Sequence, residues 1–557
     1  MRDETVTDRA RWAALVLARR LRHFGFAARR PFRSITTRRS RVPDRLIIAP
    51  QDIRTADPTV ADDIYSGYFV FDGKAVNTRG VSPFEIEPPS EAWGASLAGF
   101  GWLRHLRAAE TALARVNARA LVGDWIATGS RSAVARSDVT ARRLLSWLSQ
   151  SPLILEGADA VFYRTFTRSI ARQADALAAA VDGGLQGVAR LTALVALCEV
   201  SLCADGSARL QRKASRLLAD KLGRQILPDG GHVSRDPQVL LDLLLDLLPL
   251  RQTFAARGVP PPPLLNAIDR MMPMVRCFRH GDGTLALFNG MGSTRPDVVA
   301  TVLAYDDARG AALNNARYSG YQRLEAGDAL LIVDAGRPPP LDFAQRAHAG
   351  TLSFEFSHGA QRIIVNCGAA AEAQPAARDA SRATAAHSTL VLGERSSSRF
   401  VTRGRLRGML HGGPVHVTAE RRESPDSGML DLSHDGYASR AGALHARRLW
   451  LSRDGDRLTG EDRIQPLPTR QLAATPFAIR FHLHPGLRTL AARHGAGAMI
   501  AGPDGRRWLF EAGGLPVAIE ESIFFASPDG PRHTEQLVIR GDTTEIQVVT
   551  WTLALAT

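Results

Sequence analysis

The hydrophobic period of the chain changes once, near residue 280, and this change constrains the fold more than any other feature. From about 92 to 278 apolar residues recur every three or four positions, as in "ARLTALVALCEVSLCA" (189–204). From about 285 onward they alternate, as in "LSFEF" (352–356) and "RIIVNC" (362–367). A run of helices followed by a run of strands predicts separate α and β domains, not a doubly wound parallel sheet.

Turn signals indicate how the strands are connected. Asp454-Gly455 and Asp504-Gly505 each stand between two alternating segments, and Asp-Gly is a strong signal for a tight hairpin. The β part is therefore predicted to be antiparallel. A further hairpin is predicted at "GYFVFDGKAV" (67–76), ahead of the helices.

The net charge of +14 is concentrated at one end of the chain. Residues 1–42 hold twelve arginines against three acids, so the remaining sequence is nearly balanced. Because no stacking-aromatic or zinc-knuckle pattern accompanies the charge, no nucleic-acid partner is expected. The arm interrupts its apolar residues with arginine and has no cleavage site, so we predict no signal peptide. It suits a basic amphipathic helix that makes peripheral contact with an anionic membrane, or a docked terminal helix.

The four cysteines (Cys198, Cys203, Cys277 and Cys367) lie in apolar contexts and show no CxxC spacing. We therefore expect neither a disulfide framework nor a cysteine zinc site, and interpret these residues as small buried hydrophobes.

Several segments together resemble the heparinase II/III-like polysaccharide lyases. The resembling segments are "WGASLAGFGWLRHL" (93–106), "LVGDWI" (121–126), "TARRLLSWL" (140–148), "QILPDGGHVSRDP" (225–237), "AHAGTLSFEFSHGAQRIIVNCG" (347–368), "RATAAHSTLVLG" (382–393) and "RFHLHP" (480–485). The resemblance implies an incomplete (α/α) toroid followed by an antiparallel β-sandwich. The domains expected are a basic arm at 1–42, the toroid at 43–284 and the sandwich at 285–557.

The resemblance also implies a chemistry. Such lyases cleave a uronic-acid glycoside by β-elimination, in which the substrate carboxylate is neutralised, a base removes the C5 proton and an acid protonates the leaving oxygen. In several members two histidines and an aspartate bind a structural zinc ion. Here His348 and His387 match the two histidines, but Asn366 stands where the carboxylate ligand is expected, so we predict weak zinc binding or none.

Other matches also depart from the lyase pattern. Arg346 occupies the position of a catalytic histidine found in many members, and Val239 is the residue that matches a catalytic tyrosine. Arginine cannot accept a proton at neutral pH, but it can stabilise developing negative charge. If the protein is a lyase, we predict that Arg346 binds the substrate carboxylate together with Arg235, while Tyr321 or His232 moves the C5 proton. Arg346→Ala is then expected to abolish measurable turnover and to leave the melting temperature nearly unchanged.

Replacement catalytic groups lie near the same motifs. His232 and Arg235 stand in a glycine-rich turn ahead of a helix, where an anion would be favoured. "NARYSGYQRLEAG" (315–327) adds Tyr318 and Arg323 as candidate substrate-binding residues and Tyr321 as a candidate base and acid.

Each candidate also has a purely structural interpretation. His348 could be a hydrogen-bonded residue at the start of a strand, His232 a turn residue or cap, and Tyr318 and Tyr321 core or sheet aromatics. His482 and His484 share one face of a strand, which we predict to be solvated.

Three functional classes follow. The first is a lyase-like protein that acts on an acidic, uronate-containing polysaccharide. The second is a catalytically altered, non-enzymatic protein that binds polysaccharide or takes part in envelope assembly, which the departures at Val239, Arg346 and Asn366 favour. The third, a nucleic-acid or membrane-surface protein, is disfavoured by the balanced body of the chain. The N-terminus predicts a cytoplasmic location, whereas the family resemblance predicts a periplasmic one.

Overall fold

A computed structural model describes residues 45–128, 136–305, 310–371, 374–404, 406–424, 427–468, 471–492 and 495–556. The basic arm at 1–42, and with it the predicted membrane contact, lies outside the described residues. The chain divides into two compact units. Within the described ranges, unit 1 comprises residues 45–52, Ala56–Lys221 and Pro249–Pro261, and unit 2 comprises Ile53–Thr55, Leu222–Leu248 and the residues from Pro262 onward.

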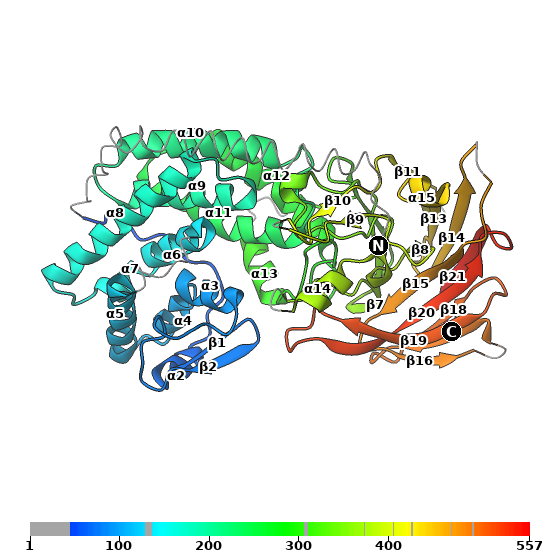
Figure 1. Ribbon diagram of the computed structural model, residues 1–557, viewed down its shortest axis with the longest axis horizontal. Coiled ribbons are helices and arrows are strands. Elements are labelled where there is room, and N and C mark those ends of the chain that lie inside the picture. The colour runs from blue at the N-terminus through cyan, green and yellow to red at the C-terminus, as the bar shows by residue number, and fades with distance from the viewer. Residues whose placement is uncertain are drawn as a thin grey trace. The chain divides into compact units, whose positions relative to one another are not determined.

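Unit 1 is helical apart from one hairpin (Figure 1). The hairpin consists of β1 (Tyr68–Phe71) and β2 (Lys74–Asn77), which confirms the turn predicted there. The helices are α2 (Val60–Tyr65), α3 (Glu91–Gly99), α4 (Leu103–Ala108), α5 (Ala112–Ala127), α6 (Ser137–Ser149), α7 (Ser151–Leu155), α8 (Ala160–Asp182), α9 (Gly187–Cys203) and most of α10 (Ala208–Gln225).

The tryptophan-bearing helices meet in the core of unit 1. Trp147 is fully buried and packs edge-on against Phe100 and Trp125, with ring centroids 5.4 Å apart in both pairs. Helix α9, whose residues from Leu191 to Cys203 are all buried, packs against α6 and α8. A helix that is apolar on every side requires neighbours around it, which explains its central place.

Apart from the β1–β2 hairpin, the strands lie in unit 2 (Figure 1). β9 (Arg399–Phe400) and β10 (Leu410–His411) form a small two-stranded sheet, and the other strands form two large antiparallel sheets. One sheet has the order β11-β12-β13-β14-β21-β18-β17-β16, and the other has the order β19-β20-β15-β7-β6-β5-β4-β3, with β8 also paired to β15. Their bounds are β3 (Asn315–Ala316), β4 (Tyr321–Ala326), β5 (Ala329–Asp334), β6 (Phe354–His358), β7 (Gln361–Val365), β8 (Leu390–Leu392), β11 (Val417–Glu423), β12 (Ser427–His434), β13 (Ala443–Ser452), β14 (Arg457–Pro466), β15 (Pro476–Leu483), β16 (Arg488–Ala491), β17 (Gly497–Ala501), β18 (Arg507–Glu511), β19 (Val517–Phe524), β20 (Arg532–Asp542) and β21 (Val548–Ala556).

Aromatic residues fill the space between the two sheets. Phe354 from one sheet stacks on Trp551 from the other with ring centroids 5.6 Å apart, and Phe481 packs against the same tryptophan. Inward residues alternate with outward ones, as the period of two predicts. The β13–β14 and β17–β18 hairpins turn at Gly455 and Gly505, both with positive φ. The predicted toroid and antiparallel sandwich are thus confirmed.

The compact units do not divide at residue 284, where we placed the domain boundary. The turn at 226–236, helix α12 (Pro262–Phe278) and helix α13 (Pro296–Ala304) belong to unit 2, and α11 (Pro237–Arg257) is shared between the units. The reason is side-chain bonding. Arg323 on β4 donates to the carbonyls of Cys277 and Arg279 at the end of α12, at 3.0 Å each, which satisfies the helix C-terminus.

Two further expectations have clear outcomes. All four cysteines are buried and free, as predicted. We predicted that His482 lies on a solvated strand face, and this prediction is wrong. The His482 ring is buried and forms hydrogen bonds with the Ser522 hydroxyl at 2.8 Å and the Ala385 carbonyl at 2.9 Å. Phe481, His482 and Leu483 at this end of β15 are all buried, so both faces of the strand are covered there. No helix within the described ranges is long and apolar enough to cross a membrane.

Candidate functional site

The turn at 226–236 places the first candidate residues. Asp229 accepts hydrogen bonds from the backbone N–H groups of Tyr318 and Ser319, at 2.8 and 2.7 Å, so the turn is fastened to the start of the β strands. Gly230 has a φ of +85°, and a Cβ at this position would lie 1.8 Å from the Arg270 carbonyl oxygen. Only glycine fits there, which accounts for the "DGG" sequence.

Arg235 follows this turn and is buried. Its Nε donates to the Ser319 carbonyl, its Nη1 to the Arg337 carbonyl, and its Nη2 to the Gly320 carbonyl and the Asp334 carboxylate. Four of the five N–H groups of the guanidinium are therefore used within the protein. This geometry does not favour the predicted role of Arg235 as a ligand for a substrate carboxylate.

Tyr321 lies directly beside this arginine. The Arg235 guanidinium sits 4.7 Å from the centre of the fully buried Tyr321 ring. The phenol donates to the Arg235 carbonyl at 2.6 Å and accepts from Asn289 Nδ2 at 2.9 Å. Burial raises the pKa of Tyr321 well above its usual value, which keeps the phenol protonated. A phenol in this state is a poor base.

Asn289 joins the tyrosine to the first histidine. Its Nδ2 donates to the Arg235 carbonyl as well as to Tyr321, and its Oδ1 accepts the backbone N–H of His348 at 3.1 Å. Its φ is +50°, a conformation that asparagine tolerates better than most residues. The group Arg235, Asn289, Tyr321, Asp334, His348 and His387 is called the buried polar site below.

His348 and His387 meet at the other end of this site. His348 Nδ1 lies 3.1 Å from His387 Nε2, and His387 Nδ1 donates to the Ala383 carbonyl at 2.8 Å. That donation makes His387 Nε2 an acceptor, so His348 Nδ1 carries the shared proton and His348 Nε2 keeps a lone pair. Nε2 of His348 has no hydrogen-bond partner among the described residues. Burial lowers the pKa of His387 to about 4 and that of His348 well below its usual value, so both rings are neutral.

Comparison with known proteins decides the family. The family model described as "Heparinase II/III-like, C-terminal" matches residues 308–552. FtsZ-localized protein C of Caulobacter vibrioides (strain NA1000 / CB15N) is 34% identical over 503 residues, which cover 87% of this chain and 85% of that protein.

The chain belongs to the heparinase II/III-like family.

Solved heparinase structures share this fold at low sequence identity. The crystal structure of heparinase III superposes with a TM-score of 0.68 and 13% identity, and covers 87% of this chain and 80% of that one. Heparan sulfate lyase HepC from Pedobacter heparinus gives a TM-score of 0.59 at 15% identity, with 93% and 86% covered. These two likenesses show the fold, a toroid followed by a sandwich, but not the activity.

Two of the three zinc ligands expected from the family resemblance, His348 and His387, are present here, and the carboxylate is missing. Two nitrogens bound to one tetrahedral zinc ion lie about 3.3 Å apart, which the histidine pair nearly matches at 3.1 Å. The Asn366 amide is neutral, and its oxygen accepts the Ser388 N–H at 2.9 Å. The neighbouring Glu355 is held by Arg362 and His280. No group of three histidine, cysteine or acidic side chains suited to a metal ion occurs among the residues that the structure describes. The residues present do not fit a structural zinc ion.

Arg346 differs from the other candidates because its side chain is 42% exposed. Its Nη2 donates to the Gly290 carbonyl, and its Nε lies 3.2 Å from Oδ2 of the buried Asp236. Burial raises the pKa of Asp236, and its Oδ2 accepts no hydrogen bond from any described residue. A Cβ on Gly290 would lie 2.3 Å from that oxygen, so the Asn289-Gly290 turn is built around this ion pair.

The side chains of the remaining candidates are bonded to residues outside the buried polar site. His232 is buried, with Nδ1 2.7 Å from the Ser234 hydroxyl and Nε2 3.1 Å from Gln225, and burial lowers its pKa to about 3. Arg323 is buried and paired with Glu325 in addition to the end of α12. Tyr318 is 53% exposed and its hydroxyl accepts from Arg317.

Sequence reasoning missed three residues that organise this region: Asn289, Asp334 and Asp236. Asn289-Gly290 is a turn signal that was available in the sequence. Asp334 ends the apolar run "ALLIVD", and a charge at the end of a buried strand indicates a partner, although the sequence does not say which one.

Proposed function

We propose that this protein is a heparinase-fold protein that acts in cell-envelope assembly at the FtsZ-dependent division site, without β-elimination by the residues predicted for it. One observation carries this proposal: the buried side chains of Arg235, Tyr321 and Asp334 already form hydrogen bonds within the protein. A lyase needs a hydrogen-bond donor that is free to neutralise a uronate carboxylate. Here four N–H groups of the buried Arg235 donate to three backbone carbonyls and one carboxylate of the protein itself.

The link to cell division comes from the relative named FtsZ-localized protein C, which shares 34% identity across most of both chains. Its name describes where that protein is found. By extension, we propose the same location for this chain, with the basic arm at 1–42 as a peripheral membrane contact.

The experiment combines location and chemistry. A fluorescent fusion expressed with labelled FtsZ should form a band that coincides with FtsZ and disperses when FtsZ is depleted. The purified protein should produce no rise in ultraviolet absorbance from unsaturated sugar when it is incubated with a panel of uronate polysaccharides. Diffuse fluorescence in cells with normal FtsZ bands would contradict the proposed location.

A second candidate function rests on a different observation, the unpartnered Nε2 of His348. A neutral imidazole with a free lone pair can remove a proton, and Arg346 stands two residues away with part of its side chain exposed. In this version the protein cleaves an acidic polysaccharide, with His348 as base and Arg346 stabilising the developing charge.

His348→Gln tests the second candidate. If a uronate polymer is cleaved by the wild-type protein, this variant should lose turnover by a factor of about a hundred or more, because the base is gone. His232→Gln is the matched control, since that buried ring has both nitrogens bonded and should leave turnover unchanged. Equal turnover of wild type and His348→Gln would exclude His348 as the base.

A further inference from the structure

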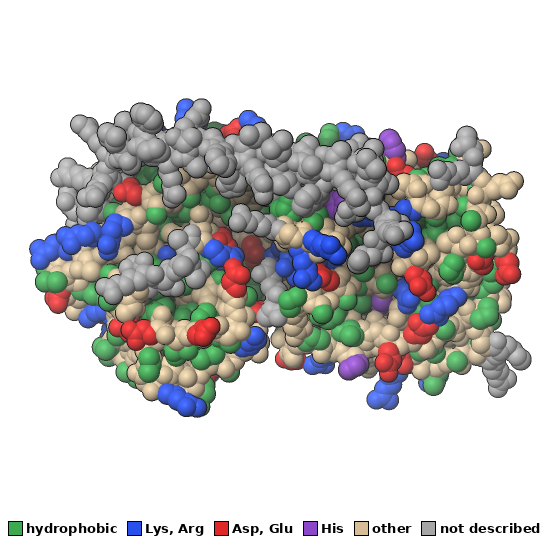
Figure 2. Space-filling view, viewed as in Figure 1, with side chains coloured by type: hydrophobic (Ala, Val, Ile, Leu, Met, Phe, Trp, Pro, Cys, Tyr) green, Lys and Arg blue, Asp and Glu red, His purple; other side chains and the backbone are tan. Residues whose placement is uncertain are grey.

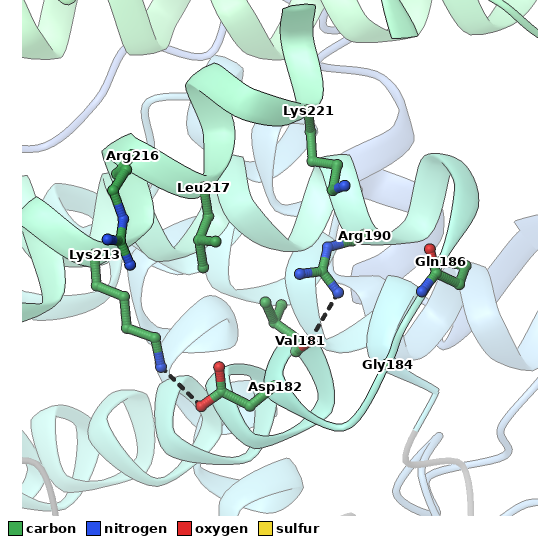
Figure 3. A pocket seen from close by; sticks show the side chains of 9 residues that line it. All are labelled: Val181, Asp182, Gly184, Gln186, Arg190, Lys213, Arg216, Leu217 and Lys221. Atoms are coloured by element: carbon green, nitrogen blue, oxygen red, sulfur yellow. Dashed lines mark hydrogen bonds and ion pairs between the residues drawn. The ribbon is translucent and has the colours of Figure 1, made fainter. Parts of the chain in front are cut away.

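A basic cavity lies in unit 1, where helix α8 ends and helix α9 begins, beside helix α10 (Figure 3). Its volume is about 410 Å³, within the range typical of small-ligand pockets. None of the residues of the buried polar site lines it. The lining residues are Val181, Asp182, Gly184, Gln186, Arg190, Lys213, Arg216, Leu217 and Lys221.

The charge of the lining is strongly one-sided. Four cations face one acid, and two of the three lysines in the whole chain are among them. Asp182 is the one acid among the described lining residues, and it forms an ion pair with Lys213 at 2.7 Å. Lys221 pairs with Asp220, which is not part of the lining. Arg190 and Arg216 have no carboxylate partner among the described residues.

Arg190 also carries an unused donor. Its Nη1 donates to the carbonyls of Val181 and Leu185, at 2.8 and 2.9 Å, and so caps the end of α8. Its Nε is buried and has no hydrogen-bond partner among the described residues. A buried N–H without an acceptor is unfavourable, and an oxyanion is a natural acceptor for a guanidinium. Figure 3 shows the Lys221 side chain extending from α10 toward this arginine.

The start of helix α9 also favours an anion in this cavity. Gln186 is its N-cap residue and lines the cavity, but its side chain makes no capping hydrogen bond. The N-terminus of a 17-residue helix carries partial positive charge, which favours an anion nearby.

We propose that this cavity binds a small, multiply charged oxyanion ligand, with phosphate or carboxylate groups on a non-aromatic scaffold such as a sugar. The charged side chains and the helix N-terminus select the anion. Among the described lining residues, Val181 and Leu217 are apolar and none is aromatic, so none of them can stack on a nucleotide base. This site is separate from the residues on which the proposed function rests, so either can fail without the other.

Isothermal titration of the full chain with sodium pyrophosphate and with digalacturonate tests the proposal and distinguishes the two anion sources. At least one probe should bind in a salt-sensitive way. Arg216→Gln should weaken that probe about tenfold or more, because a charge-assisted contact is lost. Arg212→Gln is the matched control: it removes one exposed arginine from the same helix but not from the lining, so affinity should change less than about twofold.

A second variant acts in the opposite direction. Asp182→Asn removes the acid that pairs with Lys213, so whichever probe binds the wild type should bind this variant several-fold more tightly. The proposal is overturned if neither probe binds, or if Arg212→Gln weakens binding as much as Arg216→Gln, which would indicate diffuse surface attraction. It is also overturned if ATP binds tenfold more tightly than tripolyphosphate, because the ligand class would then include a base.

Discussion

His387 Nε2 lies 3.1 Å from His348 Nδ1, although the two residues are 39 positions apart in the chain. Both rings are neutral, and the Ala383 carbonyl fixes which nitrogen donates. The two nitrogens are therefore spaced like two ligands of one metal ion, but a proton lies between them, donated by His348 Nδ1 and accepted by His387 Nε2.

The first prediction concerns zinc. We expect purified protein, exposed to zinc and then dialysed, to retain far less than one ion per chain, because Asn366 supplies no charge and Glu355 is held by other residues. Elemental analysis before and after chelation measures this. Stoichiometric zinc that disappears in His387→Gln would show that the pair finds a further ligand.

The second prediction concerns acid stability. The His387 pKa is about 4 when folded and about 6.5 when unfolded, so the unfolded chain binds more protons between these values. Stability is therefore lost as pH falls from about 6.5 to 4, by about 3 kcal/mol for this residue. Urea unfolding at pH 7 and pH 4.5 should show a smaller loss in His387→Gln than in the wild type. Equal losses would mean that burial does not lower this pKa.

The third prediction revises the expected effect of Arg346→Ala. Sequence alone predicts an unchanged melting temperature, but the structure places Nε of Arg346 3.2 Å from the buried Asp236. We expect a loss of about 1–2 kcal/mol at pH 8, reduced from the value for a fully buried pair because Arg346 is partly exposed.

The pH dependence identifies the cause. Without Arg346 the Asp236 pKa rises further, so the folded state binds the extra proton and the stability deficit shrinks as pH falls toward 5. Asp236→Asn in the same background should restore most of the loss. Arg337→Ala, which removes an exposed arginine, is the control and should be neutral. A pH-independent loss would contradict this account.

The fourth prediction concerns the sandwich core. Asp462 accepts from Arg447 and His445 at 2.8 and 2.7 Å and from Trp551 at 3.0 Å, and all four side chains are buried. Asp462→Asn should cost about 3–5 kcal/mol of unfolding free energy, because it leaves the Arg447 charge without compensation.

The matched control for that variant is Asp431→Asn. Asp431 and Arg448 also face each other across adjacent strands, but their side chains are 27% and 37% exposed, so we expect a loss of at most about 1 kcal/mol. Chemical denaturation of both variants measures the difference. Equal costs would mean that burial of the Asp462 cluster is unimportant.

The charge distribution illustrates what composition could predict. Basic and acidic side chains are interspersed over the face of unit 2 shown in Figure 2, as expected from a nearly balanced body of sequence. The absence of a nucleic-acid partner stays a prediction.

Local pattern determined the architecture. Hydrophobic period follows from the 3.6-residue turn of a helix and the two-residue repeat of a strand, so the change near residue 280 correctly predicted the helices and the strands. The Asp-Gly turn signals correctly predicted two of the hairpins. The close approach of His348 and His387 was also predictable, because both residues lie in segments that resemble the zinc-binding segments of the heparinase II/III-like lyases.

Tertiary structure alone decided which candidate residues remain available for chemistry. Arg235, Tyr321 and His232 resemble catalytic groups in the sequence, but each is buried and bonded to partners that lie far away in the chain or within its own turn. Whether an arginine is free depends on acceptors such as Asp334, 99 residues away, and a local pattern carries no information about such a pairing. Burial sets the pKa values for the same reason, since desolvation is a property of the folded surroundings and not of the neighbouring sequence.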